Sequence, residues 1–161
     1  MKTLYVLRHG QAEPESERVT DHQRALTRRG RAEVERTAAA VAERAVLPSL
    51  VLTSSAARAQ QTAELCALAG PARPELVIVD ELYLAEPDAY ATAVQEHAGR
   101  HDAVMVVGHN PGLEVLIHAM TERSEHLATA TVVEIHLPLA SFAELSLARR
   151  AQGRLVFAFR P

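Results

Sequence analysis

The run Ala103–Val107 contains only apolar residues and leads directly into Gly108 and His109. A short stretch without polar alternation is typical of a strand buried on both faces, as in the middle of a parallel sheet. Parallel strands need long crossover connections, so such a strand requires further strands with helices between them. The sequence therefore predicts an α/β fold.

Short apolar runs and helical patterns alternate along the rest of the chain. Thr27 is suited to cap a first helix, and Pro111 to the first turn of a last one. We expect a single domain over residues 1–161, in which helices cover both faces of a mostly parallel central sheet, and the two last strands allow a differently built edge. Strands are expected at 2–8, 50–53, 75–79, 103–107, 131–137 and 154–160, and helices at 27–44, 56–69, 87–99 and 112–122.

Composition argues against several classes of protein. The chain has 161 residues and a formal net charge of −3, whereas a general nucleic-acid binder is normally basic. Since no apolar stretch has the length of a membrane span and the chain starts on a predicted strand, we expect no membrane partner. The single cysteine, Cys66, lies in a helical pattern and is expected to be a core residue, so we expect a cytoplasmic protein.

Charged and titratable side chains stand at the ends of three predicted strands. Arg8 and His9 follow the first strand, Ser54 and Arg58 follow the second, and His109 follows the fourth. The carboxyl ends of parallel strands lie at one edge of a sheet, so these residues can meet. Arg58 is also near the first turn of its helix, where free N–H groups attract anions. Two imidazoles and two guanidiniums around one point predict a phosphate site.

A metal ion is the alternative use of two histidines. Arg8 and Arg58 would oppose a cation beside His9 and His109, and no carboxylate belongs to the pattern. We therefore expect neither a metal nor another cofactor.

Four segments, taken together, resemble the histidine phosphatase superfamily. The chain length and the sequence His109-Asn110-Pro111-Gly112 are similar to its small SixA-like branch of phosphohistidine phosphatases. The resemblance covers essentially the whole chain, and it implies a three-layer, phosphoglycerate mutase-like fold and a metal-independent phosphatase. The four segments are Leu7–Gly10, Leu26–Gly30, Thr53–Ala63 and Val107–Glu114.

The resemblance also implies roles for individual residues. His9 would accept the phosphoryl group and form a phosphohistidine, which water then hydrolyses. Arg8, Arg58 and His109 would hold the phosphoryl oxygens, with His109 acting in its protonated form. Gly10 would let the loop backbone approach the substrate.

Two features of the pattern leave alternatives open. Arg24 either reaches the rim of the phosphate site or pairs with Asp21, three residues before it. The general acid of larger family members has no clear counterpart, and Glu81 is the first candidate and Glu86 the second. A phosphoramidate needs such an acid less than an alkyl phosphate does, because its leaving nitrogen is readily protonated.

The expected partner is a phosphorylated protein or a phosphorylated small molecule. The leading hypothesis is hydrolysis of phosphohistidine or of a small phosphomonoester. The alternatives are a phosphate-binding module without turnover and a phosphomutase, although the chain has little sequence from which to build a lid over a larger substrate. The sequence favours no particular oligomeric state.

Overall fold

A six-stranded sheet forms the centre of the computed structural model, which describes residues 1–71 and 73–161. Its strand order is β3-β2-β4-β1-β5-β6. The first four strands run parallel, and β5 and β6 are antiparallel to their neighbours, which confirms the mostly parallel sheet with a different edge. The strands are β1 (Lys2–Arg8), β2 (Leu50–Ser54), β3 (Glu75–Val79), β4 (Ala103–Gly108), β5 (Val132–Leu137) and β6 (Arg154–Phe159).

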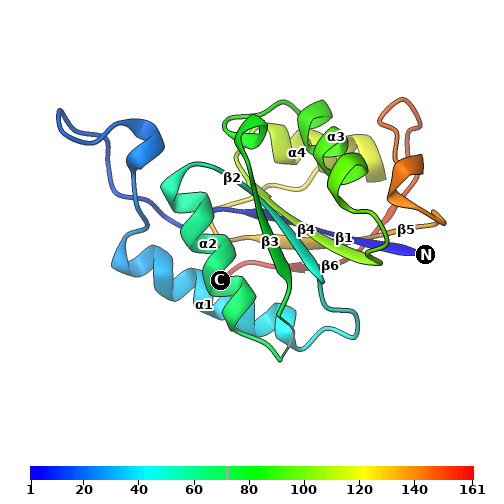
Figure 1. Ribbon diagram of the computed structural model, residues 1–161, viewed down its shortest axis with the longest axis horizontal. Coiled ribbons are helices and arrows are strands. Elements are labelled where there is room, and N and C mark those ends of the chain that lie inside the picture. The colour runs from blue at the N-terminus through cyan, green and yellow to red at the C-terminus, as the bar shows by residue number, and fades with distance from the viewer. Residues whose placement is uncertain (72) are drawn as a thin grey trace.

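Helices cover both faces of this sheet. Figure 1 shows α1 and α2 on one side and α3 and α4 on the other. Each lies where the sequence predicted a helix, with ends that differ by a few residues, and residues 138–152 contain a single 3-10 turn, η3 (Phe142–Glu144). The helices are α1 (Arg28–Ala42), α2 (Ala57–Leu68), α3 (Pro87–His97) and α4 (Gly112–Thr121), and two further 3-10 turns are η1 (Asp21–Gln23) and η2 (Asp80–Leu82).

Alternating side chains of β1 build two separate apolar layers. Leu4 and Val6 are fully buried in the layer under α3 and α4, whereas Tyr5 and Leu7 are fully buried in the layer under α1 and α2. Burying each such side chain contributes about 1.5–3 kcal/mol. Because both faces are covered, functional groups can reach solvent only at the strand ends and along the edges.

The register of the sheet brings the two histidine segments together. Arg8 of β1 pairs with Gly108 of β4, so His9 and His109 leave neighbouring strands at the same level. A side chain at position 108 would collide with Tyr90, whose hydroxyl oxygen would lie 2.1 Å from an added Cβ. The glycine therefore lets Tyr90 pack directly beneath the strand end.

The segment between β1 and α1 extends away from the body of the molecule at the left of Figure 1. It is tied back at its end by Thr27, the predicted cap, whose hydroxyl accepts a 2.9 Å hydrogen bond from the Gly30 N–H and donates to Gln11 Oε1. One 3-10 turn, η1, interrupts the segment at Asp21–Gln23.

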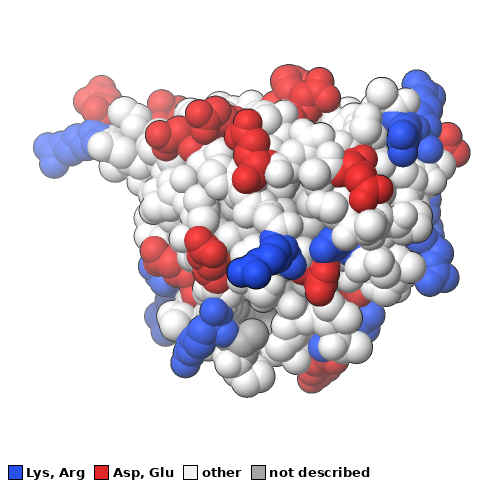
Figure 2. All heavy atoms as spheres, turned by 45° about the vertical axis from the view of Figure 1, so that its right-hand side comes forward, with Lys and Arg blue, Asp and Glu red and all other residues white. Residues whose placement is uncertain are grey.

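The exposed surface is acidic where α3 and α4 lie. Figure 2 shows acidic side chains along the upper part of this face. Segment 74–99 contributes six acids and no lysine or arginine. None of the described helices has both the length and the apolar character needed to cross a membrane.

Candidate active site

His9 is held in one tautomer immediately after β1. Its Nδ1–H donates a 2.7 Å hydrogen bond to the Gly10 carbonyl, which leaves the lone pair on Nε2. Only 7% of the residue is exposed, and this burial, reinforced by Arg58 and Arg8, lowers its pKa to about 4. At neutral pH the ring is therefore uncharged and has an unprotonated, nucleophilic nitrogen.

Gly10 itself is enclosed by the start of α1. An added Cβ would lie 2.7 Å from Val34 Cγ2 and 2.9 Å from the Gly30 carbonyl oxygen. Its N–H donates to the hydroxyl of Thr62 on α2. These contacts fix the carbonyl that orients His9.

His109 faces His9 from the end of β4, with the two ring centroids 5.1 Å apart. Its Nδ1 accepts a 3.4 Å hydrogen bond from Arg58, so its Nε2–H donates to Ser54 Oγ at 2.8 Å. The backbone N–H donates to the hydroxyl of Tyr90. Burial, followed by repulsion from a protonated His9 and from Arg58, lowers the pKa of His109 to about 3.

Arg58 connects the two rings. It lies in the first turn of α2, is 3% exposed, and donates through Nε to His9 Nε2 at 3.3 Å. Its other edge contacts Asp21 of η1, through NH1 to the backbone oxygen at 2.7 Å and through NH2 to the carboxylate at 3.2 Å. The cluster therefore joins three strand ends to the long β1–α1 segment.

Two further arginines bring buried donors that lack a protein partner. Arg8 donates through NH1 to the Leu127 carbonyl at 2.9 Å, but its Nε has no hydrogen bond. The Nε of Arg24 is likewise buried without one, 3.6 Å from a carboxylate oxygen of Asp21. Buried donors are normally satisfied, so these two N–H groups are available to an anion. Both possibilities raised for Arg24, the ion pair and the anion site, are compatible with this position.

The structure does not bring the predicted acid Glu81 to the cluster. Glu81 is exposed in η2 and lines a surface hollow together with Glu96 and His97, and Glu86 is exposed just before α3. The reason is that Leu82 anchors the 3-10 turn in the core, so its neighbour turns outward. Glu81 is thus removed from the candidate site on geometric grounds.

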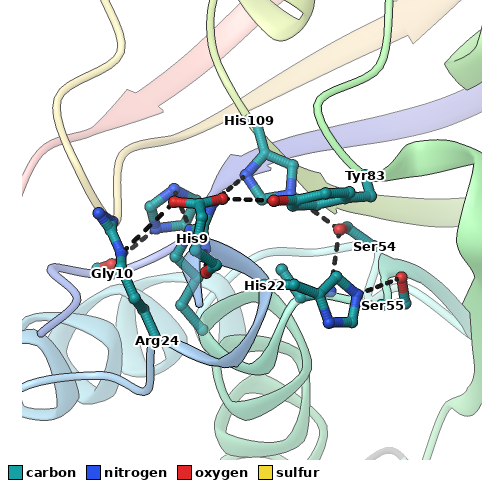
Figure 3. A network of polar contacts seen from close by, with 11 residues as sticks. His9, Gly10, His22, Arg24, Ser54, Ser55, Tyr83 and His109 are labelled. Carbon is teal, nitrogen blue, oxygen red and sulfur yellow. Dashed lines mark hydrogen bonds and ion pairs between the residues drawn. The ribbon is translucent and has the colours of Figure 1, made fainter. Parts of the chain in front are cut away.

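Tyr83, which was not among the predicted site residues, enters the site from the same segment. Its hydroxyl donates to the Asp21 carboxylate, and its ring lies edge-on to His109 with centroids 5.7 Å apart. Figure 3 shows Tyr83 and His109 side by side, with Arg24 at the other end of the network. No spacing in the sequence singles out Tyr83, whereas the Asp21-x-x-Arg24 pattern was visible.

Among residues 1–71 and 73–161, no group of three or more histidine, cysteine, aspartate or glutamate side chains could hold a metal ion. The cluster instead offers guanidinium and imidazole N–H groups around a neutral nucleophilic nitrogen. Such a set binds a tetrahedral oxyanion and can transfer a phosphoryl group to nitrogen.

An α/β fold with this cationic strand-end cluster defines a phosphoryl-transfer class of protein. The family model of the histidine phosphatase superfamily (branch 1) matches residues 4–83. The chain belongs to the histidine phosphatase superfamily and is a phosphatase. No curated protein sequence matches the chain.

Solved structures of small family members are similar over the whole chain. A protein of Agrobacterium tumefaciens assigned as a phosphohistidine phosphatase SixA is 27% identical, with a TM-score of 0.83 over 99% of this chain and 98% of that one. A protein histidine phosphatase SixA complexed with tungstate is 20% identical, with a TM-score of 0.80 over 98% and 96%. A mycobacterial glucosyl-3-phosphoglycerate phosphatase, 15% identical, reaches a TM-score of 0.67 over 96% of each chain.

Proposed function

We propose that the protein hydrolyses phosphohistidine, or a small phosphomonoester, through a covalent phosphohistidine on His9. The observation that carries the proposal is the hydrogen bond from His9 Nδ1 to the Gly10 carbonyl, which leaves Nε2 as a lone pair among cationic donors. In the first step Nε2 attacks phosphorus and the bond from phosphorus to the leaving group breaks. Arg8, Arg58 and His109 stabilise the charge on the three remaining oxygens.

The same hydrogen bond supports the second step. With Nδ1–H retained by the Gly10 carbonyl, phosphorylation of Nε2 gives a positively charged phosphoimidazolium. This form loses its phosphoryl group readily, because the ring departs as neutral imidazole. Water attacks phosphorus, the bond to Nε2 breaks, inorganic phosphate leaves with both protons of the water, and His9 returns to its starting tautomer.

The absence of a suitable acid among the described residues of the site favours a phosphoramidate. A phosphohistidine substrate needs its proton on the ring nitrogen remote from phosphorus, which can face solvent. An alkyl phosphate needs a proton on the oxygen being released, inside the site. Asp21 cannot supply it at neutral pH, because the hydroxyl of Tyr83 and the charge of Arg58 hold the pKa of its carboxyl below the usual range.

His109 is neutral at physiological pH until an anion arrives. A bound phosphate dianion would raise its pKa and favour the protonated ring, which then holds a phosphoryl oxygen. Phosphate binding should therefore weaken at alkaline pH. The two alternative functions differ from hydrolysis in the fate of the phosphoryl group. A binding module would not release it as inorganic phosphate, and a mutase would pass it to another hydroxyl group.

The test is rapid-quench labelling with a phosphohistidine protein, an aryl phosphate and a sugar phosphate, each carrying labelled phosphorus. We expect an acid-labile label on the wild type and release of inorganic phosphate, fastest from the phosphohistidine protein. His9→Ala should lose label and turnover but still bind phosphate, and His118→Ala, which changes an exposed histidine of α4, should behave as the wild type. Normal turnover by His9→Ala would refute the proposal, and a label that never yields phosphate would favour a binding module or a transferase.

A further inference from the structure

Asp21 is the acceptor that holds Arg58 from outside the cluster. Its backbone oxygen accepts from NH1 at 2.7 Å, and its carboxylate accepts from NH2 at 3.2 Å. The pair is asymmetric in burial, since the side chain of Arg58 is 3% exposed and that of Asp21 is 34% exposed. The buried guanidinium thus depends on a residue of the exposed β1–α1 segment.

The other contacts of Arg58 within the cluster offer no negative charge to balance the guanidinium. Its Nε and NH2 face the neutral rings of His9 and His109, at 3.3 Å and 3.4 Å. Arg8 is near enough that Arg58 and Arg8 repel, which contributes to the lowered pKa of Arg8 after burial. A long side chain beside a like charge turns toward solvent unless an anion holds it. Asp21 is the carboxylate that the structure places on Arg58.

Tyr83 holds the Asp21 carboxylate in turn. Its hydroxyl donates to Oδ2, the same oxygen that accepts from Arg58. Its ring is fixed edge-on between His22, with centroids 4.8 Å apart, and His109, at 5.7 Å. Figure 3 shows Tyr83 between these two histidines. The β3–α3 connection therefore reaches Arg58 through Tyr83 and Asp21.

Neither group serves as a proton donor to the substrate. The hydroxyl proton of Tyr83 is directed at Asp21, and that hydrogen bond raises the pKa of the phenol. Asp21 is ionised at neutral pH, as described above. Asp21 and Tyr83 therefore contribute to the reaction through the position of Arg58, which they hold.

We propose that Asp21 and Tyr83 are positioning residues that aim the Arg58 guanidinium at the phosphoryl group in front of His9 Nε2. The proposal rests on the proposed phosphoryl transfer to His9 and adds two residues to its machinery. A phosphoryl group that reaches Nε2 must displace the Arg58 Nε–H from the lone pair. Because Asp21 holds the terminal nitrogens, the guanidinium can turn toward a phosphoryl oxygen without leaving the site.

The test is a double-mutant cycle of Asp21→Asn and Arg58→Lys, read out as the dissociation constant of inorganic phosphate and as kcat and KM with an aryl phosphate. Lysine keeps the charge but cannot make the two-pronged contact with Asp21. We expect Asp21→Asn to weaken phosphate binding and kcat/KM about tenfold in the wild type, and less than about twofold beside Arg58→Lys. Asp80→Asn, which removes an exposed negative charge at the start of η2, should change neither the dissociation constant of phosphate nor kcat/KM.

Tyr83→Phe gives an independent readout, because it keeps the ring and removes only the hydroxyl. We expect a loss of kcat/KM of about threefold in the wild type and almost none beside Asp21→Asn, since the hydroxyl acts through that carboxylate. Equal losses from Asp21→Asn in both Arg58 backgrounds, or an equal loss from Tyr83→Phe with and without Asp21→Asn, would overturn the positioning role. Failure of the positioning role would leave the label on His9 of the wild type in place and would appear only in the phosphate dissociation constants and kcat/KM values of the variants. Failure of the proposed function would instead show as the absence of a label on His9 in the wild type.

Discussion

The two buried histidines should make the protein sensitive to mild acid in a way that His109→Gln relieves. Burial lowers the pKa of His9 to about 4 and that of His109 to about 3, from an ordinary value of 6.5. The unfolded chain therefore binds more protons than the folded protein between pH 6.5 and about 4. Stability is fully present above that window and falls as the pH falls through it.

The size of the effect follows from these pKa values. At pH 5 each histidine is almost fully protonated in the unfolded chain and almost fully neutral in the folded protein. Each therefore removes about 2 kcal/mol from the free energy of unfolding between pH 7 and pH 5, at about 1.36 kcal/mol per pH unit once protonation of the unfolded chain is complete. His9 and His109 are the two histidines whose lowered pKa values produce this acid loss.

The assay is urea denaturation at pH 7 and pH 5 in a buffer without phosphate. His109→Gln should lose about 2 kcal/mol less than the wild type on acidification, whereas His118→Gln, on the exposed face of α4, should lose as much as the wild type. Added phosphate should reduce the acid loss of the wild type and bind with proton uptake at pH 6, which titration calorimetry in two buffers detects. An identical acid loss in His109→Gln and wild type would refute the argument that burial keeps this ring neutral.

Three further changes test other parts of the structure. Glu81→Gln should leave phosphohistidine and alkyl phosphate turnover within about twofold of the wild type in steady-state assays, because its side chain points away from the cluster; a loss of orders of magnitude on alkyl phosphates would restore it as the general acid. Glu114→Gln should weaken phosphate binding several-fold by calorimetry, because Glu114 Oε1 accepts from Asn110 and from the N–H of Leu127, whose carbonyl holds Arg8. Thr27→Ala should lower the free energy of unfolding by about 1 kcal/mol in urea, with little change in kcat, because it removes the cap of α1.

The parts of the fold that local patterns determine were predictable. The uniformly apolar run at 103–107 indicated a central strand, and β4 lies between β2 and β1 in the sheet. Thr27 and the helical spacing after it placed the start of α1 correctly. Strand order was predictable only in part, since the pairing of β5 with β1 depends on contacts between segments more than a hundred residues apart.

The candidate site divides in the same way. The rule that parallel strands end at one edge of a sheet predicted that Arg8, His9 and His109 lie together. The pairing of Arg8 with Gly108 puts the ends of β1 and β4 side by side, as that rule requires. Glu81 could not be placed from the sequence, because proximity to a strand end does not say which way a side chain turns. In the structure the buried Leu82 turns the side chain of Glu81 outward. Tyr83 was missed because its partner, Asp21, is 62 residues away in the chain.

The arrangement of acceptors behind the arginines explains how a buried cationic cluster can be ready for a dianion. Arg58 is held by Asp21 and Arg8 by the Leu127 carbonyl, so both guanidiniums are in place before substrate arrives, and Arg58 has only to turn its Nε–H from His9 toward a phosphoryl oxygen. Keeping His9 and His109 neutral limits the self-repulsion of the cluster to that of its arginines. Because the proposed roles of these groups concern only the phosphoryl group, the choice among substrates must depend on residues around the cluster, such as Tyr83, which lies edge-on to His109, and the exposed His22, which lies edge-on to Tyr83.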